Sequence, residues 1–514
     1  MKRRTLLTNA LLGAPAVQTA LLTSAARAAQ TAPAEELSAD VLVLGAGFAG
    51  LASAIAAARA GARVAVLEKR GYAGGDGILS AGILAAAGTP LHEAQGIPGD
   101  WSVEAYWQRI LDGKEDEPLS KVRDNMPLSP IYSGVAKHNP EVLRRSAFRS
   151  PDVAAFVQSF GIEFLPINPH QPFLLPSKPG SMPRLAKAML GELERLGAAV
   201  LLNVQAESLQ LENGRMAGAL ARRLAGPYKG GALRIEAPAV IAATGGFSDN
   251  EALMKRYKRV WADIPIGFTA VGEGVPPGHD GDGIQMGRRI GAGVEDMESM
   301  PKLYAAPRKG MRSPSWILFD TDSAYLVDRG GKRFVNEHEA RYAGCAVEAF
   351  RRHIDGAYMV FDEETFRGPN SERWQLAKIF AAGGLFKGWT PEEAAAAAGV
   401  DPQGLRETVE RINADAARGA DSEYGRRDRL FRALSGPFYV SAPSWPVRFK
   451  TEGGLEVNPD FVVIRASDES PIEGFYAAGA TCGSISSRLC DVLASALIAG
   501  ENAAKSAKAQ RTLS

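Results

Sequence analysis

Short apolar runs that end at glycine turns recur along the chain and predict its architecture. Val41–Leu44 precedes a glycine-rich turn and an alanine-rich helical stretch, and a second run at residues 62–67 leads into Glu68. Later apolar runs end at Thr244-Gly245-Gly246 and at Gly479. Continuous apolar runs bounded by turns are typical of strands that are buried on both faces of a parallel sheet. The pattern predicts an α/β fold.

Two longer stretches have helical character. Residues 390–419 are rich in alanine and charge, and Thr390 stands before Glu392 and Glu393 as at a helix N-terminus. We expect this stretch to be a solvated helical surface and not a binding site. Residues 491–507 are apolar and rich in alanine, and they predict a final helix near the C-terminus.

Residues 1–28 have the pattern of an export signal. Arg3 and Arg4 form a basic start, an apolar stretch follows, and residues 26–28 match a small-residue cleavage site. Gly13 and Pro15 interrupt the apolar stretch, so no stable membrane span is expected here. The segment resembles a twin-arginine signal, which exports proteins already folded, and it predicts a location in a bacterial periplasm. A disordered amphipathic tail is the alternative.

Composition excludes several classes of protein. At 514 residues the chain is too long for one simple core, which favours two domains. Hydrophobic residues make up 46% and charged residues 23%, as in ordinary globular enzymes, and a net charge of +1 gives no basic excess for nucleic acid. The three cysteines lack C-x-x-C spacing, so no disulfide framework, zinc site or covalent c-type haem is expected.

The strongest local signal is the pattern Gly45-x-Gly47-x-x-Gly50 inside a complete strand–helix–strand unit. Gly45 permits a tight turn, Gly47 lets the backbone approach a pyrophosphate, and Gly50 allows helix and strand to pack closely. The helix N-terminus offers free N–H groups to the phosphates. Glu68, eighteen residues after Gly50, is placed to accept hydrogen bonds from a ribose hydroxyl. The unit predicts a bound dinucleotide.

The later glycine turns favour FAD over NAD. Glu68 is followed by a second glycine-rich loop, residues 74–77, and then by Ser80-Ala81-Gly82, where a nicotinamide-binding domain would return directly to a helix. Strands that end in glycine continue as far as Gly479, which suits one FAD threaded through a discontinuous domain. Residues 74–85 contain no histidine, so we expect the FAD to be non-covalent.

At these motifs the chain resembles the fumarate reductase/succinate dehydrogenase flavoprotein superfamily, with soluble flavocytochrome c fumarate reductases, urocanate reductases and 3-ketosteroid Δ1-dehydrogenases as relatives. The motifs GAGFAG, ATGGF, GDG, RFVNE, KTEGGL and FYAAG carry the resemblance from about residue 39 to the end. It implies a discontinuous Rossmann-like FAD-binding domain at 31–247 and 440–514. An α+β capping domain is inserted at 248–439, with the active site between the two.

Most of the residues expected to contact FAD lie in these glycine turns. They are Gly45, Gly47, Phe48, Ala49, Gly50, Glu68, Lys69, Gly74, Gly75, Asp76, Ser80, Gly82, Ala206, Ala243, Thr244, Gly245, Gly246, Asp282, Gly453, Gly454, Gly479, Leu493 and Ala494. The run from His279 to Gly283 is too crowded with acids and glycines for a metal site, and the resemblance implies a turn beside the flavin there. No metal is expected.

The resemblance implies that an arginine shortly after an Asn-Glu pair donates the proton, and Arg341 follows Asn336-Glu337 at that position. In the ketosteroid branch a tyrosine stands there, and Tyr342 is one place off that pattern. The pKa of arginine, above about 12, requires a proton relay for such a role. Bidentate anchoring of a carboxylate is the alternative, and a plain surface charge is a third.

The remaining site residues match the family pattern only in part. Arg488 matches a second family arginine, in a C-terminal loop that is shorter here, and Lys450 stands where the family has a histidine. Met300 occupies the position of another carboxylate-holding histidine, although a lone methionine is more often core packing. We therefore expect an unsaturated acid or enone with a less polar tail, and not fumarate.

Three functions stay open. The first is an exported FAD-dependent oxidoreductase that reduces or forms a C=C bond conjugated to a carboxylate or carbonyl. It would exchange electrons with a separate carrier, such as a cytochrome or a quinone-linked protein. The second is a Δ1-dehydrogenase of ketosteroids or cyclic ketones that uses Tyr342. The third is a non-catalytic FAD-binding electron-transfer partner.

Overall fold

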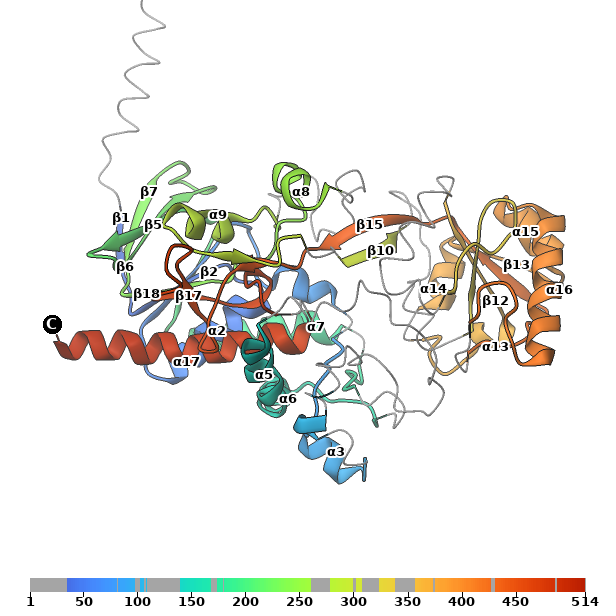
Figure 1. Cartoon of the computed structure of the whole chain (residues 1–514), viewed down its shortest axis with the longest axis horizontal. Helices are drawn as coiled ribbons and strands as arrows, with labels where there is room; N and C mark the ends of the chain where they lie inside the picture. The colour runs from blue at the N-terminus through green and yellow to red at the C-terminus, as the bar shows by residue number, and fades with distance from the viewer. Residues whose placement is uncertain are drawn as a thin grey trace, which may run out of the picture.

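Two lobes joined by a two-stranded ribbon make up the described part of the chain (Figure 1). The computed structural model describes residues 35–80, 82–97, 102–105, 108, 139–167, 173–178, 180–259, 278–298, 302–306, 323–337, 356–372, 375–426, 430–485 and 488–513. The expected export signal at residues 1–28 lies outside these ranges. In Figure 1 the blue N-terminal strands and the red C-terminal helix share one lobe, and the orange segments form the other.

A six-stranded sheet, in the order β17-β18-β8-β2-β3-β4, forms the centre of the first lobe. All neighbouring pairs are parallel except β17 with β18. Its strands are β2 (Val41–Leu44), β3 (Val64–Glu68), β4 (Ala199–Leu202), β8 (Ala239–Ala242), β17 (Val462–Ile464) and β18 (Pro471–Ala477). Segments from both ends of the chain thus build one sheet, as a discontinuous domain requires.

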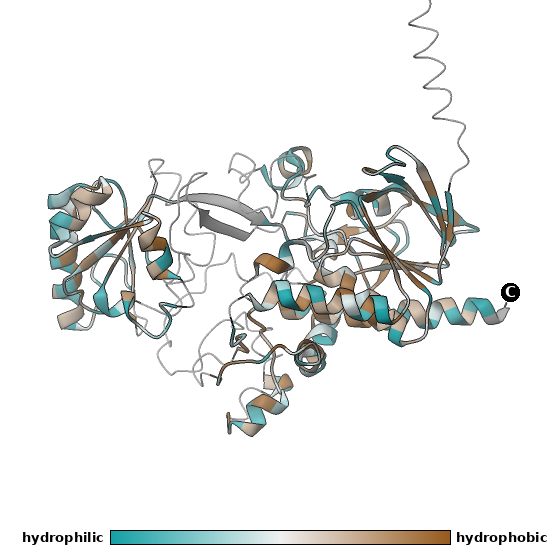
Figure 2. Ribbon diagram, turned by 180° about the vertical axis from the view of Figure 1, so that it is seen from behind, coloured by the Kyte–Doolittle hydropathy of each residue, from teal (hydrophilic) through white to brown (hydrophobic). Residues whose placement is uncertain are grey.

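Helices cover one face of this sheet. The small-residue helix α2 (Phe48–Arg59) packs beside the long C-terminal helix α17 (Leu489–Leu513), and α7 (Ser181–Arg195) packs against α2. A Cβ atom on Gly500 of α17 would lie 2.3 Å from the carbonyl oxygen of Ser53 in α2, so a glycine is needed for this close approach. In Figure 2 the central strands of this lobe are mostly brown, the colour of apolar residues.

A second, four-stranded sheet covers the other face. Its order is β1-β7-β6-β5, and only β1 with β7 is parallel. The strands are β1 (Glu35–Ser38), β5 (Val204–Glu212), β6 (Arg215–Arg223) and β7 (Ala232–Glu236). Shorter helices complete the lobe: η1 (Gly75–Leu79), α3 (Pro90–Ala94), α5 (Pro140–Phe148), α6 (Ser150–Gln158), α8 (Glu251–Tyr257), α9 (Asp282–Arg289) and η5 (Gly479–Thr481).

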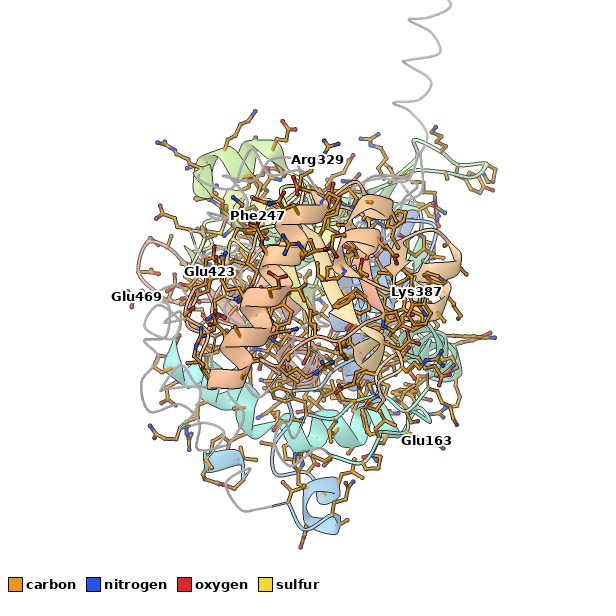
Figure 3. The ribbon with its side chains drawn as sticks, turned by 90° about the vertical axis from the view of Figure 1, so that its right-hand side faces the viewer. Glu163, Phe247, Arg329, Lys387, Glu423 and Glu469 are labelled. Carbon is orange, nitrogen blue, oxygen red and sulfur yellow. The ribbon has the colours of Figure 1, made fainter. Side chains whose placement is uncertain are left out.

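The second lobe is an antiparallel sheet between helices, with the strand order β11-β12-β14-β13. Alternate residues of β12 face opposite sides, so that Met359 and Phe361 pack with α14, whereas Tyr358 and Val360 pack with α15 and α16. The elements are β11 (Tyr325–Val327), β12 (Tyr358–Asp362), α13 (Glu363–Phe366), α14 (Leu376–Ala381), β13 (Leu385–Gly388), α15 (Pro391–Ala398), α16 (Pro402–Arg418) and β14 (Phe438–Ser441). Figure 3 views the molecule from the end of this lobe, with Lys387 and Glu423 labelled at its two sides.

Two short antiparallel strand pairs lie outside the three larger sheets. β10 (Lys302–Ala306) pairs with β15 (Trp445–Lys450) to form the ribbon between the lobes, and β9 (Val294–Glu295) pairs with β16 (Gly454–Leu455). The chain therefore enters and leaves the second lobe through neighbouring strands, which is the geometry of an inserted domain. Residue 440, where the family resemblance places the return to the FAD-binding domain, lies inside β14 of the second lobe.

The α/β architecture predicted from the apolar runs is confirmed, with shifted boundaries. The second strand spans Val64–Glu68 and not residues 62–67, because residues 62 and 63 belong to the connection between α2 and the strand. The stretch 390–419 forms two helices, since Gly399 adopts φ 75° and ends the first. Thr390 caps that first helix by accepting the N–H of Glu393 at 3.3 Å. None of the described helices combines the length and apolar composition needed to cross a membrane.

Candidate functional site

The turn between β2 and α2 and the first turn of α2 have the geometry that the three glycines predict. Gly45 adopts φ 100°, and a Cβ atom on it would lie 2.5 Å from the carbonyl oxygen of Ala243. A Cβ atom on Gly50 would lie 1.8 Å from the carbonyl oxygen of Gly45, so only glycine allows this helix–strand contact. A Cβ atom on Gly47 would meet nothing within 4 Å. The open space lies above Gly47, where a pyrophosphate would approach the backbone.

The N-terminus of α2 carries no side-chain cap. Gly47 is the N-cap residue, no side chain bonds to the first-turn N–H groups, and the first turn contains no acidic residue. Phe48 and Ala49, both expected to contact FAD, are buried in this turn. Uncapped N–H groups and the positive end of the helix dipole favour an anionic ligand here.

Glu68, the acid at the end of β3, lies beneath this turn. Its two carboxylate oxygens accept the backbone N–H groups of Ala46 and Arg70, each at 2.8 Å. Each oxygen keeps a second lone pair, so the carboxylate is still able to accept a ribose hydroxyl. The bonds fix the acid and the turn relative to each other.

The second glycine loop packs directly against the first. Gly74 forms a β-bridge with Gly47, and its N–H donates to the carbonyl of Ala46 at 2.7 Å. A Cβ atom on Gly75 would lie 3.0 Å from the Cα atom of Gly47. Further along the loop, the hydroxyl of Ser80 accepts the N–H of Gly82 at 3.0 Å. The two loops therefore border the same space.

Three threonine hydroxyls join the remaining glycine turns. Thr244 accepts the N–H of Gly283 at 3.0 Å, Thr481 accepts the N–H of Gly245 at 3.0 Å, and Thr451 accepts the N–H of Phe247 at 2.9 Å. Phe247, labelled in Figure 3, is fully buried. These contacts bring the ends of β8, β15 and β18 to one place. Sequence reasoning missed Thr451 and Thr481, because no local pattern marks a hydroxyl that bonds to a distant backbone.

Several other expected cofactor residues lie at this junction. Gly246 would clash with Thr451 if it carried a Cβ atom, since that atom would be 2.3 Å from the hydroxyl oxygen. A Cβ atom on Gly454 would lie 2.1 Å from the carbonyl oxygen of Thr481. The glycines thus allow the turns to touch. The remaining expected residues here are Ala243, Gly453, Gly479, Leu493 and Ala494, and all five are buried.

A charged cluster lies beside Glu68. Lys69 Nζ contacts carboxylates of both Asp280 and Asp282, the latter at 3.1 Å, and Gln205 Nε2 donates to Asp282 Oδ2 at 3.0 Å. Burial raises the pKa of Asp280, Lys69 opposes the increase, and the like charge of Asp282 adds to it. A hollow of about 230 Å³ borders this cluster, and Ala206 and Asp282 both line it.

A second charged cluster joins the two cofactor loops. His279 Nε2 bonds to Asp76 Oδ2, and Arg70 Nη1 lies 3.6 Å from Asp76 Oδ1. Burial by itself raises the pKa of Asp76, but the hydrogen bond from His279 and the charges of His279 and Arg70 together lower it below its usual value. Asp76 therefore stays ionised across the neutral range.

The described residues fit an FAD molecule. The uncapped helix, the open space above Gly47 and the carboxylate of Glu68 match a dinucleotide. Nowhere in the described ranges do three His, Cys, Asp or Glu side chains group as metal ligands.

The expected catalytic residues are only partly described. Arg341, Tyr342 and Met300 lie outside the described residues. Lys450 ends β15 and Arg488 directly precedes α17, and both are half-buried. The loops that carry them meet at a β-bridge between Leu455 and Cys482. The structure thus brings together the two chain segments of Lys450 and Arg488.

A buried ionic network ends four residues before Arg341. Arg333 donates to Glu337 at 2.8 and 2.9 Å and to Asp421 at 2.9 and 3.0 Å. Arg426 Nη1 lies 3.4 Å from Glu337, and its side chain is fully buried. The two positive and two negative charges balance, so the cost of burying each charge is offset. The network fixes Glu337 at the point where the chain leads to Arg341.

A buried lysine, Lys258, also lies at the site and was missed from the sequence. Its Nζ donates to the carbonyls of Met297 at 2.9 Å and Glu452 at 3.0 Å, and it lies 5.1 Å from the centre of the Phe247 ring. It therefore holds the loop after Lys450.

The two described cysteines, Cys482 and Cys490, are free and buried, and burial raises the pKa of each thiol. Such thiols are poor nucleophiles.

Comparison with known proteins identifies the family. The model of a family described as "FAD binding domain" matches residues 40–123 and 169–490. The chain is 29% identical over 492 residues to an NADH:fumarate oxidoreductase of Klebsiella pneumoniae (strain 342), covering 91% of this chain and 48% of that protein. The chain thus spans about half the length of this relative.

This chain covers a larger share of a urocanate reductase and of a solved flavoprotein structure. The chain is 30% identical over 496 residues to the urocanate reductase of Eggerthella lenta, covering 90% of this chain and 74% of that protein. The open conformation of a flavocytochrome c3 fumarate reductase matches with a TM-score of 0.72 and 24% identity, covering 94% of this chain and 81% of that one. This structural likeness shows a shared fold. The chain therefore belongs to the FAD binding domain family, with FAD as its cofactor, and to the fumarate reductase-like branch of FAD-dependent oxidoreductases that act on CH–CH groups.

Proposed function

We propose that this enzyme reduces a carbon–carbon double bond conjugated to a carboxylate or carbonyl, or forms it in the reverse direction. The observation that carries the proposal is the junction of glycine turns. Thr451, directly after Lys450, bonds to the backbone next to Gly246, and Thr481, seven residues before Arg488, bonds to Gly245. Two cationic residues are thus attached to loops that border the cofactor space.

These residues suit an anionic or carbonyl-bearing substrate. When bound, FAD supplies or accepts the hydride at its N5 atom. Lys450 and Arg488 would orient the substrate and stabilise negative charge that develops on its carboxylate or carbonyl oxygen. Arg341 would donate the proton to the substrate carbon, with Glu337 and Arg333 holding the chain before it. Electrons would be exchanged with a separate carrier.

The substrate class follows from differences between this chain and its relatives. The relatives named above act on fumarate and urocanate, as their names state. Lys450 keeps a positive charge at one end of the expected site, whereas Met300 is unable to hold a carboxylate at the other. We infer an unsaturated acid or enone with one polar end and a less polar tail.

A panel of electron acceptors tests this inference. The purified enzyme is reduced anaerobically by light, and unsaturated monoacids, dicarboxylates and enones are added one at a time. Flavin absorbance reports reoxidation. We expect at least one monoacid or enone to reoxidise the flavin faster than fumarate does. Preference for fumarate would contradict the substrate class, and failure of every compound would favour a non-catalytic electron-transfer protein.

We also propose export to the periplasm, supported by Arg3 and Arg4 and the apolar stretch that follows. Replacing both arginines with lysine keeps the charge but removes the twin-arginine pattern. In a bacterial host with this pathway, the wild-type chain should be found in the periplasmic fraction and the variant in the cytoplasm. Equal distribution of the two would contradict the proposal.

A further inference from the structure

Lys258, directly after α8, is a buried lysine that the chemistry proposed above does not use. Its backbone N–H donates to the carbonyl of Met254 at 2.7 Å, and its side chain is only 2% exposed. Lys255 on the same helix is 69% exposed and pairs with Glu251, as is usual for a lysine. Burying an ammonium group is costly unless its N–H groups are bonded. The groups that Lys258 binds should therefore show why a lysine stands here.

The ammonium group of Lys258 joins two separate loops. Nζ donates to the carbonyl oxygen of Met297 at 2.9 Å and to that of Glu452 at 3.0 Å. Met297 lies two residues after β9, and Glu452 lies between β15 and β16. The ring of Phe247 is centred 5.1 Å from Nζ, and its face favours a cation. A protonated lysine has three N–H donors and no acceptor, so it suits a place where carbonyls converge.

The two loops are in direct contact beside the ammonium group. A Cβ atom on Gly453 would lie 2.3 Å from the carbonyl oxygen of Asp296 and 2.8 Å from the Cα atom of Met297. Next to this contact the two chains form the short β9–β16 pair. Lys258 thus bridges the two chains at one end of that pair, with one carbonyl from each chain.

The loop that Lys258 holds is the one that follows Lys450. The hydroxyl of Thr451 accepts the backbone N–H of Phe247 at 2.9 Å, and the carbonyl of the next residue, Glu452, accepts Lys258 Nζ. Two consecutive residues after Lys450 are therefore attached to the segment that runs from the end of β8 through α8. These two bonds fix the backbone from which the half-buried side chain of Lys450 extends.

We propose that Lys258 is a positioning residue, which sets the affinity of the site for the carboxylate or carbonyl end of the substrate by fixing Lys450. Lys450 is assigned to the substrate by the function proposed above, on which this inference rests. A hydrogen bond weakens steeply when its distance and angle change, and charge-assisted bonds are the strong ones. A loop released from the ammonium group would therefore present Lys450 less well, although Lys258 itself contacts only the protein in this role.

Binding of inert substrate mimics to the FAD-loaded enzyme tests the inference. Benzoate and acetophenone have an apolar ring with a carboxylate or a carbonyl, and neither has a CH–CH bond next to that group to oxidise. Each is titrated into the oxidised enzyme, and the change in flavin absorbance reports binding. In Lys258→Met, which keeps the volume but loses the ammonium group, we expect the dissociation constant of the mimic to rise about tenfold. FAD should bind as tightly as in the wild type, and the exposed control Lys255→Met should match the wild type in both measurements.

A double-mutant cycle separates positioning of Lys450 from a general structural effect. Lys450→Met should itself weaken binding of the mimic. In that background Lys258→Met should add little, because residues that act through one another are not additive. Thermal unfolding of each variant checks that it is folded. If Lys258→Met does not fold, Lys258→Gln, which is shorter and uncharged, replaces it with the same expectations.

Four results would overturn the proposal. The wild type binds neither mimic, or Lys258→Met binds the mimic as tightly as the wild type does. The effect of Lys258→Met persists in full in the Lys450→Met background, or FAD affinity falls by the same factor as mimic affinity. The last two would make Lys258 a structural residue only. The proposed reaction is tested separately: if the wild type binds a mimic but no acceptor of the panel reoxidises the flavin, the reaction fails, whereas the role of Lys258 is still decided by the titrations.

Discussion

The hydroxyl of Thr481 accepts a hydrogen bond from the backbone N–H of Gly245 at 3.0 Å, although the two residues are 236 positions apart. Gly245 follows β8, and Thr481 follows β18, the neighbouring strand of the central sheet. Parallel strands bring their carboxyl ends to one edge, and ligands of such sheets bind at that edge. The Thr481–Gly245 contact therefore fixes two walls of the cofactor site relative to each other.

Removing this hydroxyl should loosen the site. Thr481→Val keeps the shape of the side chain but leaves the Gly245 N–H without its acceptor, which costs about 1–3 kcal/mol of unfolding free energy. We expect urea unfolding of the apoprotein to show this loss and FAD binding to weaken. Thr481→Ser, which keeps the hydroxyl, is the control. If Thr481→Val matched the wild type in both measurements, the contact would have no role in the site.

The buried ionic network of the second lobe should be sensitive to the loss of one charge. Glu337→Gln leaves Arg333 and Arg426 with only Asp421 to balance them, and breaking a buried pair costs about 3–5 kcal/mol. The thermal unfolding midpoint should fall accordingly. Glu410→Gln in α16 changes an exposed pair with Arg406 and should have little effect. Equal effects of the two substitutions would show that the network contributes no more than a surface pair.

Glu363 should make stability depend on pH. Burial by itself raises the pKa of Glu363, but hydrogen bonds from Tyr439, Arg367 and Lys387 lower it to about 2. A carboxyl group with a lowered pKa stabilises the fold at neutral pH, and this stabilisation is lost as pH falls below the unfolded value of about 4.3. Glu363→Gln should therefore lose about 1 kcal/mol at neutral pH and less in acid. Urea unfolding over a pH series measures this difference, and a constant difference would contradict the assignment.

Much of the first lobe was predictable from the sequence, because its signals are local. The apolar runs that became β2 and β8 are buried at every position, and the glycines between β2 and α2 have the roles that their spacing implies. The helix of residues 491–507 is part of α17, which begins two residues earlier at Leu489. Local periodicity and glycine spacing suffice for such elements.

The contacts that complete the site were not predictable, because they join distant segments. Thr451 is an ordinary polar residue in the sequence, yet it bonds to Phe247, 204 positions away. His279 was interpreted as part of a turn, and only the folded chain places it against Asp76. Lys258 has no motif around it, and its role depends on two carbonyls from other loops. The periodicity of a sequence indicates which face of a helix or strand is buried. It does not indicate which distant residue a side chain will bond to.

Transfer of hydride and proton to a conjugated double bond is the central claim, and one rapid-mixing measurement tests it most directly. Wild-type and Arg341→Ala enzymes are reduced anaerobically and mixed with the best acceptor from the panel, and the rate of flavin reoxidation is recorded. Tyr342→Phe is the matched comparison. We expect fast reoxidation of the wild type and of Tyr342→Phe. For Arg341→Ala, which should still bind FAD, we expect a rate about 10²–10⁴-fold lower. A wild-type rate in Arg341→Ala, or a loss confined to Tyr342→Phe, would contradict this mechanism.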